Sequence, residues 1–473
     1  MNGSTSRAVG TVARARETIS VVLDRLDARL AKIARHFPEG LTNGPIAPAT
    51  LAAFLGLVTI DKNSLWHDEA FSVSAARLPT LSLLRYLWQN EMHASPYYLA
   101  LHPWLALGEG EAQVRLLSVV FGVVAVLATY AIGSRFGVGF PAAMVLAATP
   151  FFIQFEQETR GYTMLAAGSA ISSLAYLRLL EHFTLLRGLV YVACGAAIIY
   201  VHPLGALVIV AHALGSLVLA VPRIRLRVLL LFVPIVVGWI PMLRFSLIHT
   251  GKIEWIPPLT PELALEYLIT LGGGGVLAVA LAGLAIRGIR RDVISLWLLV
   301  PIIGAIAISV LVQPTMQARY LISVLPAAAI IIARNRAILV TGFVIASLVG
   351  VANWYVNGTK EDWRGAVAWV QSQARPGDGI VFVPHYDRLS FEVYGQAGEP
   401  LYPAVEWRRY MPDWGLGNVP EVVYNERIWF FNSRNRSIPE NVARLIEPYQ
   451  QVAEYRFGET VPLVKLLIRR SAS

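Results

Sequence analysis

The sequence predicts an α-helical membrane protein that crosses the bilayer about eleven times and carries a small α/β domain outside the membrane. Hydrophobic residues make up 55% of the 473 residues and charged residues only 15%, whereas a soluble protein is roughly a quarter charged. Apolar runs of about the 20 residues that span a bilayer recur over residues 46–356. Over residues 357–473 the apolar fraction falls and charged residues become frequent.

The N-terminal tail, residues 1–45, is basic. Ile19, Leu23, Leu26 and Leu30 recur at three- and four-residue spacings, and arginines stand between them. This periodicity predicts an amphipathic helix, and its charge favours a position on the cytoplasmic leaflet of the membrane. An ordinary helix that packs on a cytoplasmic loop is the alternative interpretation.

The orientation of the membrane region follows from its charges. Lys and Arg are more than twice as frequent in the N-terminal tail and the loops on its side as in the loops on the other side. The positive-inside rule places the N-terminus in the cytoplasm, and an odd number of spans places the C-terminus outside. The net charge of +9 is spread over these short loops, which favours contact with anionic membrane lipids and not with nucleic acid.

One predicted span contains the run Gly272–Gly275. The run is not followed by Lys and Ser or Thr, so it predicts close packing or a kink in the helix and not a phosphate-binding loop. The predicted spans lie near residues 46–61, 114–133, 138–155, 161–180, 188–202, 203–221, 228–247, 264–286, 293–313, 320–333 and 337–356.

Two substantial regions are expected on the outer side. The first is a long loop, residues 61–113, which is rich in aromatic and acidic residues. The second is residues 357–473, in which "DWRGAVAWVQSQA" predicts a helix and "PGDGIVFVP" and "RIWFFN" predict strands. We therefore expect the second region to form the α/β domain.

Ionisable and aromatic residues gather at the outer ends of the predicted spans. A charge so close to hydrocarbon costs several kcal/mol unless it faces a cavity or another charge. The pattern therefore predicts one polar pocket on the outer face of the membrane. Its candidate residues are His67, Asp68, Glu69, His93, Tyr97, Glu158, Arg160, Tyr162, His202, Lys252, Arg319 and Tyr320.

Five motifs carry a resemblance to a known family. They are "LWHDEAFS" at 65–72, "YYLALHPW" at 97–104, "QETRGY" at 157–162, "ARYLISVLPA" at 318–327 and "EDWRGA" at 361–366. The chain resembles the GT-C class of membrane glycosyltransferases, in particular the bacterial relatives of protein O-mannosyltransferase and the aminoarabinose transferase of lipid A. Many relatives have His-Pro-Pro-Leu-Tyr-Tyr where residues 93–98 here read His-Ala-Ser-Pro-Tyr-Tyr, so no detailed role is carried over to His93.

The resemblance implies an enzyme of the plasma membrane that takes its sugar from a polyprenyl-phosphate donor. The sugar would be mannose, arabinose or an amino sugar, and the acceptor a hydroxyl of a glycan, lipid or protein. Transfer with inversion needs a carboxylate that takes the acceptor proton and cations that stabilise the leaving phosphate.

The site residues then receive roles. Asp68 is expected to be the base, and Glu69 and Glu158 to orient it or to pair with arginines. The leaving phosphate is expected to bind Arg160, Arg319, Lys252 and Tyr320. Supporting or acceptor-side positions are expected for His67, His93, Tyr97, Glu158, Tyr162 and His202.

Structural roles are the alternatives for the charged residues. Asp68 would then cap a helix that opens at Ala70. Arg160 and Arg319 would be partners of Glu156 or Glu158. A metal site is conceivable because five histidines fall on the outer side, but none has a ligand spacing such as His-x-x-x-His, so we expect neither a metal nor another cofactor. These histidines are His67, His93, His102, His202 and His249.

A transporter or flippase of lipid-linked sugars is the competing function. Transporters carry their charged residues near the middle of the membrane, on broken helices and in two related halves. Here the polar residues fall on one side, and the sequence has no visible internal repeat. The pattern therefore favours transfer over transport.

Overall fold

The structure is a computed structural model of the whole chain, and most of its elements are helices. It describes residues 3–36, 38–249, 255–375, 378–383, 385–395, 426–432, 438, 440–457 and 463–470. The chain divides into two compact units. Unit 1 comprises Met1–Gly56, Ser118–Glu156 and Gly161–Trp354, and unit 2 comprises Leu57–Leu117, Gln157–Arg160 and Tyr355–Ser473.

Unit 1 is a bundle of apolar helices. Their bounds are α1 Gly3–Ala34, α2 Glu39–Asn43, α3 Ile46–Leu57, α8 Gly139–Ala148, α9 Pro150–Glu156, α10 Tyr162–Glu181, α11 Leu185–Val201, α12 Gly205–Leu219, α13 Pro222–Leu230, α14 Phe232–Ile248, α15 Pro261–Gly272, α16 Gly275–Gly288, α17 Val293–Leu311, η3 Ala318–Val324, α18 Leu325–Ala333 and α19 Ala337–Asn357. Helix α7, Glu111–Ser134, begins in unit 2 and continues in unit 1.

The helices fit a membrane-embedded protein. Among the described residues, five helices are long and apolar enough to cross a bilayer, and a bent pair makes a sixth. These five are α7, α10, the continuous stretch Pro222–Ile248, α17 and α19. Shorter apolar helices coincide with the remaining predicted spans, so the total of eleven stays a prediction.

The bent pair replaces the single span predicted over residues 264–286. Helices α15 and α16 meet at an angle of 88°. Between them Gly273 has a φ of +75° and Gly274 a φ of +140°, which side chains rarely adopt. A Cβ atom on Gly273 would also lie 2.7 Å from the ring of Pro150. The glycine run is therefore a bend, as its position inside an apolar segment predicted.

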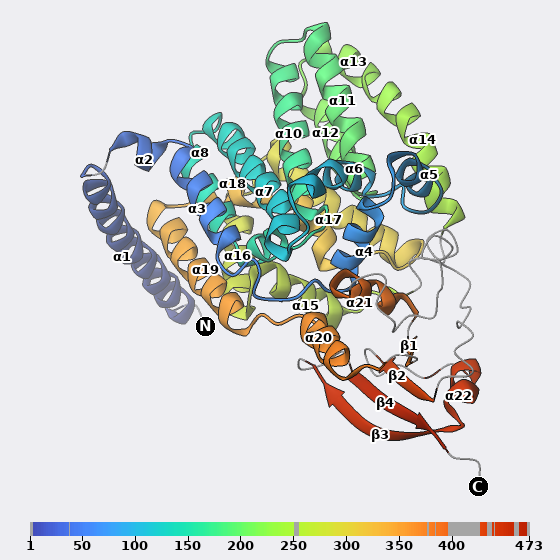
Figure 1. The fold of residues 1–473 in the computed structure, drawn as a ribbon. Coiled ribbons are helices and arrows are strands. Elements are labelled where there is room, and N and C mark those ends of the chain that lie inside the picture. The colour runs from blue at the N-terminus through green and yellow to red at the C-terminus, as the bar shows by residue number, and fades with distance from the viewer. Residues whose placement is uncertain are drawn as a thin grey trace. The chain divides into compact units, whose positions relative to one another are not determined.

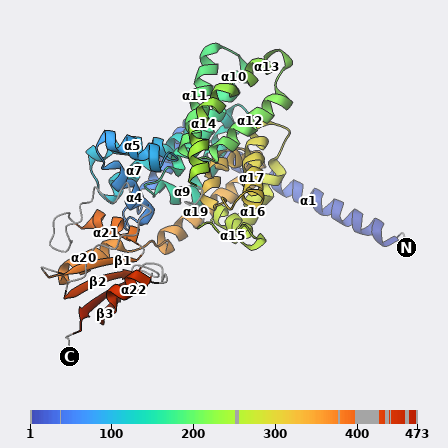
Figure 2. The same ribbon diagram turned by 90° about the vertical axis from the view of Figure 1, so that its right-hand side faces the viewer.

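Helices α10 to α14 stand side by side in unit 1 (Figures 1 and 2). Polar side chains inside this group bond to one another: the ring nitrogens of His212 lie 3.0 Å from Ser173 Oγ and 3.2 Å from Tyr191 Oη. The hydroxyls of Tyr176 and Ser216 lie 2.8 Å apart. These hydrogen bonds satisfy polar groups in a part of the protein where water cannot do so.

Helix α1 packs on the turn between α18 and α19. Arg336 Nη2 donates to Ser20 Oγ at 2.8 Å, and the backbone nitrogen of Ile338 donates to Asp27 Oδ1 at 2.7 Å. This is the contact expected of a helix that packs on a loop. Contact of its other faces with lipid stays a prediction.

Unit 2 begins with three helices where the sequence analysis expected a long loop. They are α4 His67–Ala76, α5 Thr80–Asn90 and α6 Ser95–Trp104, followed by η1 Leu105–Leu107. Proline stands just before or in the first turn of α5 and α6, a position that proline favours. Helix α5 buries Leu83, Tyr86 and Leu87, the spacing of one apolar helix face.

The remainder of unit 2 contains a four-stranded sheet of order β1-β2-β4-β3 (Figure 1). Strands β1 and β2 are parallel, and β4 is antiparallel to both β2 and β3. Two of the strands and helix α20 occur where the sequence predicted them. The elements are α20 Trp363–Gln373, β1 Gly379–Val383, η4 His385–Asp387, α21 Arg388–Tyr394, β2 Arg427–Asn432, α22 Glu440–Ile446, β3 Tyr449–Arg456 and β4 Leu463–Arg469.

Helices cover both faces of this sheet. On one face Trp363 of α20 and Phe391 of α21 pack against Trp429 of β2. On the other face Val442 of α22 packs against Phe430 of β2. Alternate residues of a strand point to opposite faces. The continuous apolar run of β2 therefore packs against the helices on both faces of the sheet.

Two glycines of α16 provide a matched test of the packing in unit 1. A Cβ atom on Gly288 would collide with the carbonyl oxygen of Ile331, whereas one on Gly283 meets nothing within 4 Å. Gly288→Ala should therefore lower the melting temperature of the protein in detergent by several degrees. Gly283→Ala should leave it unchanged or slightly higher, because alanine favours the helix. Equal melting temperatures for the two variants would contradict the packing of α16 on α18.

Candidate active site

The candidate site in unit 2 starts at the first turn of α4. The N-cap of this helix is Trp66, so Asp68 and Glu69 both lie in its first turn, where the helix dipole favours negative charge. The backbone nitrogen of Trp66 lies 3.4 Å from Glu69 Oε2. The structural alternative for Asp68, capping of a helix that opens at Ala70, is therefore wrong.

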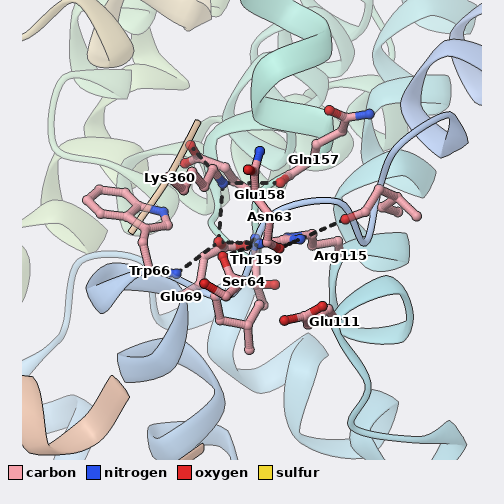
Figure 3. A network of polar contacts seen from close by, with 12 residues as sticks. Asn63, Ser64, Trp66, Glu69, Glu111, Arg115, Gln157, Glu158, Thr159 and Lys360 are labelled. Atoms are coloured by element: carbon pink, nitrogen blue, oxygen red, sulfur yellow. Dashed lines mark hydrogen bonds and ion pairs between the residues drawn. The ribbon is translucent and has the colours of Figure 1, made fainter. Parts of the chain in front are cut away.

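Glu69 is fully buried, and five donors converge on its carboxylate, the backbone nitrogen of Trp66 among them (Figure 3). Arg115 binds this carboxylate in a bidentate manner: Nε donates to Oε1 at 2.7 Å and Nη2 donates to Oε2 at 2.8 Å. The backbone nitrogen of Thr159 donates to Oε1 at 2.8 Å. Lys360 Nζ donates to Oε2 at 3.2 Å. One carboxylate thus joins α4, α7, the segment 157–160 and the linker that follows α19.

Arg115 uses its remaining donors on the chain that leads into α4. Its Nη1 donates to the carbonyl oxygens of Ile60 and Asn63, each at 2.7 Å, and its Nη2 donates to that of Ser64 at 3.0 Å. The side chain is only 1% exposed. A guanidinium with all these donors engaged fixes the path of the backbone just before the catalytic candidate Asp68.

The surroundings of Glu69 decide its charge. Burial by itself raises the pKa of this carboxyl, but the charges of Arg115 and Lys360 and the hydrogen bonds to it outweigh burial and hold the pKa at about 2. Glu69 is therefore a carboxylate at neutral pH and a poor proton acceptor there. Glu69 pairs with Arg115 and Lys360, whereas the arginines considered from the sequence were Arg160 and Arg319.

Asp68 and Arg160 meet beside α6. Arg160 Nη1 lies 3.3 Å from the backbone oxygen of Asp68, 3.3 Å from Ser72 Oγ and 3.2 Å from Tyr98 Oη. Burial raises the pKa of Tyr98 well above its usual range, so this hydroxyl stays neutral. Unit 2 therefore brings the predicted base and one predicted phosphate ligand to the same turn of α4.

Glu158 and Glu156, the two acids considered from the sequence as arginine partners, have different surroundings. In unit 2, Glu158 Oε1 lies 3.3 Å from Lys360 Nζ. In unit 1, both carboxylate oxygens of Glu156 are buried with no hydrogen-bond partner among the described residues. The alternative pairing of Arg319 with Glu156 is therefore not found.

Three further candidates lie in unit 2. The ring of His67 lies 4.5 Å from that of Tyr386, beside the contact between α4 and α21. His93 Nε2 lies 3.2 Å from the carboxylate of Glu91. Tyr97 is fully buried in α6.

Unit 1 gathers a second set of predicted residues around η3. The guanidinium carbon of Arg319 lies 5.4 Å from the ring of Trp255, 5.6 Å from that of Tyr320 and 6.0 Å from that of Tyr162. The ring of His202 lies 4.4 Å from that of Tyr320. Aromatic faces attract a cation, so these rings help to orient the guanidinium.

Lys252 lies outside the described residues. Within the residues that the structure describes, no group of three His, Cys, Asp or Glu side chains is arranged to hold a metal ion. Of the five histidines considered from the sequence, His102 donates from Nδ1 to the Ala76 backbone oxygen at 2.7 Å, and its Nε2 lies 3.0 Å from Thr80 Oγ1.

Arg115 and Lys360 both bind Glu69, but neither was among the site residues predicted from the sequence. A weak sequence signal existed for each of them. Arg115 lies at the start of a predicted span, where a charged side chain needs a partner. Lys360 directly precedes the motif "EDWRGA", which carried part of the family resemblance.

Comparisons with known proteins give the fold. No protein-family model matches the sequence, and no curated protein matches it. The crystal structure of ArnT from Cupriavidus metallidurans bound to undecaprenyl phosphate matches with a TM-score of 0.55 and 13% identity, over 89% of this chain and 97% of that one. The apo state of the same ArnT gives a TM-score of 0.54 at the same identity and coverage.

The structure of arabinosyltransferase EmbB from Mycobacterium smegmatis matches with a TM-score of 0.41 and 14% identity, over 69% of this chain and 32% of that one. The two ArnT structures, which cover nearly the whole chain, carry the conclusion. This chain has the fold of ArnT, as the five motifs predicted when they indicated the GT-C class.

Proposed function

We propose that the chain is a membrane glycosyltransferase that moves a sugar from a polyprenyl-phosphate donor to an acceptor hydroxyl on the outer face of the membrane, with inversion. The observation that carries the proposal is the turn of α4 at which Arg160 Nη1 lies 3.3 Å from the backbone oxygen of Asp68. A carboxylate and a guanidinium on one turn are what this transfer needs. The fold shared with ArnT, one structure of which holds undecaprenyl phosphate, supports a lipid-linked donor.

The proposed step forms one bond and breaks one. The acceptor oxygen attacks the anomeric carbon of the sugar, and the bond from that carbon to the phosphate oxygen breaks, with its electron pair leaving on the phosphate. The proton of the acceptor hydroxyl passes to the carboxylate of Asp68. Glu69 is proposed to position this base, because its own carboxylate already accepts from Arg115, Lys360 and the backbone of Thr159.

Arginines are proposed to bind the leaving phosphate. Arg160 is oriented by neutral groups, Ser72 Oγ and Tyr98 Oη, and Arg319 by aromatic rings. A guanidinium matches phosphate oxygens with two donors. Because guanidinium groups supply the charge, the proposed step uses no metal or other cofactor. Lys252 and Tyr320 are proposed to support the same phosphate.

The remaining assignments are proposed on the family resemblance. The N-terminus lies in the cytoplasm, residues 46–356 form the plasma-membrane region, and the outer side holds residues 61–113 and 357–473. Mannose is the favoured sugar, before arabinose or an amino sugar, and the acceptor is a glycan, a lipid or a protein. The supporting residues are proposed to be His67, His93, Tyr97, Glu158, Tyr162 and His202.

Asp68→Asn tests the proposed base. The purified wild-type protein in detergent should convert a polyprenyl-phosphate sugar to free polyprenyl phosphate and glycosylated product. Asp68→Asn should lower the turnover by about 100-fold or more, because the amide cannot take the proton. Asp61→Asn, the same change at an exposed position of the same loop, is the matched control and should remain active.

Either of two results would count against this function. Full turnover by Asp68→Asn would remove Asp68 as the base. Movement of the donor across a vesicle membrane, with no cleavage in detergent, would indicate a transporter.

Arg160→Gln and Arg319→Gln test the phosphate sites. Each should lower kcat by about 100-fold, because the leaving phosphate loses a fixed cation. Arg160→Lys and Arg319→Lys should lower kcat less, since lysine retains the positive charge but lacks the bidentate donors of the guanidinium. Arg85→Gln on α5, which is exposed, is the control. Unchanged kinetics in either arginine variant would exclude that arginine from the phosphate site.

A further inference from the structure

Lys360 lies on the linker between α19 and α20, and its side chain is buried, with 8% of it exposed. The linker has no helix or strand of its own at this residue. Nζ contacts Glu69 Oε2 at 3.2 Å, Glu158 Oε1 at 3.3 Å and the backbone oxygen of Gln157 at 3.4 Å. Figure 3 shows the ammonium group between the two carboxylates. One side chain thus joins α4 to the segment 157–160.

Lys360 is a cation that two buried carboxylates share. Glu69 and Glu158 are 0% and 4% exposed, so water screens neither carboxylate well. Arg115 is a further cation of the cluster, and both Nε and Nη2 of its guanidinium bind Glu69. Glu111 pairs with Arg364 and accepts a hydrogen bond from Tyr394 of α21. Loss of Lys360 would remove the shared cation from between the two buried carboxylates and make the cluster more negative by one charge.

The segment 157–160 would respond to that excess charge. Glu69 is fixed on α4 by Arg115, whereas Glu158 belongs to the same short segment as Arg160. Repulsion between Glu69 and Glu158 would push this segment away from α4. Arg160 Nη1 would then lose its contacts with Ser72 Oγ at 3.3 Å and Tyr98 Oη at 3.2 Å. Without these contacts Arg160 would no longer be held at the first turn of α4.

We propose that Lys360 is a positioning residue that neutralises Glu69 and Glu158 together and so holds Arg160 at the turn that carries Asp68. The proposal rests on the proposed function for its kinetic consequence. It makes the linker into residues 357–473 part of the machinery that sets the geometry of the site. Lys360 itself contacts no reacting atom.

The test compares Lys360→Met with Lys360→Met/Glu158→Gln in the full-length protein in detergent. Lys360→Met should lower kcat by at least about tenfold, because small displacements of a catalytic group have effects of that size. The double variant should recover most of the activity, since it also removes one of the two buried negative charges. A role of Lys360 in packing alone would predict no recovery.

Hydrogen–deuterium exchange of residues 157–162 is the second readout, and it does not depend on turnover. Exchange should rise in Lys360→Met and return toward that of the wild type in the double variant. Lys62→Met is the matched control, since its Nζ donates to the backbone oxygens of Tyr355 and Val356; adding Glu158→Gln to this variant should restore neither activity nor protection.

The outcomes separate the two proposals. If the wild type transfers no sugar, the proposed function fails and the exchange measurement alone decides the role of Lys360. If exchange in Lys360→Met equals that of the wild type, or if Glu158→Gln restores neither activity nor protection, the positioning role is wrong.

Discussion

The constraint on which unit 2 depends is the buried ion pair of Glu69 and Arg115. Moving two charges out of water costs several kcal/mol for each, and the contact between them offsets this only when the remaining polar atoms are also satisfied. Here three backbone carbonyls turn toward Arg115, and a backbone nitrogen and Lys360 turn toward Glu69. The backbone on either side of the pair therefore has little freedom.

This constraint separates two carboxylates that are adjacent in sequence. Glu69 is enclosed by cations and holds its charge, whereas Asp68 is partly exposed on the preceding position of the same helical turn. The buried residue Glu69 fixes the direction of α4, and the partly exposed residue Asp68 is the proposed base. Sites built on ordered elements, with partners locked behind them, hold their geometry better than sites on loops alone.

Much of this could be predicted from the sequence, because apolar length and local motifs are local signals. The apolar helices, two of the strands, helix α20 and the bend at Gly273 occur where the pattern indicated. The helices of residues 61–113 were missed, since polar and aromatic residues there conceal a short helical period. The partners of Glu69 were missed for another reason: Arg115 is 46 residues away in the chain and Lys360 is 291 residues away, and no local pattern records such pairs.

The most direct measurement of the central constraint is a double-mutant cycle on stability with Glu69→Gln, Arg115→Met and the double variant. Each single change should cost about 3 kcal/mol or more at pH 7, and the double variant should cost clearly less than the sum, because it leaves no buried charge alone. The pKa of Glu69 is about 2, against 4.5 ordinarily, so the cost of Glu69→Gln should be complete above pH 4.5 and shrink as the pH falls toward 2. Additive losses, or a cost that does not change with pH, would contradict the account.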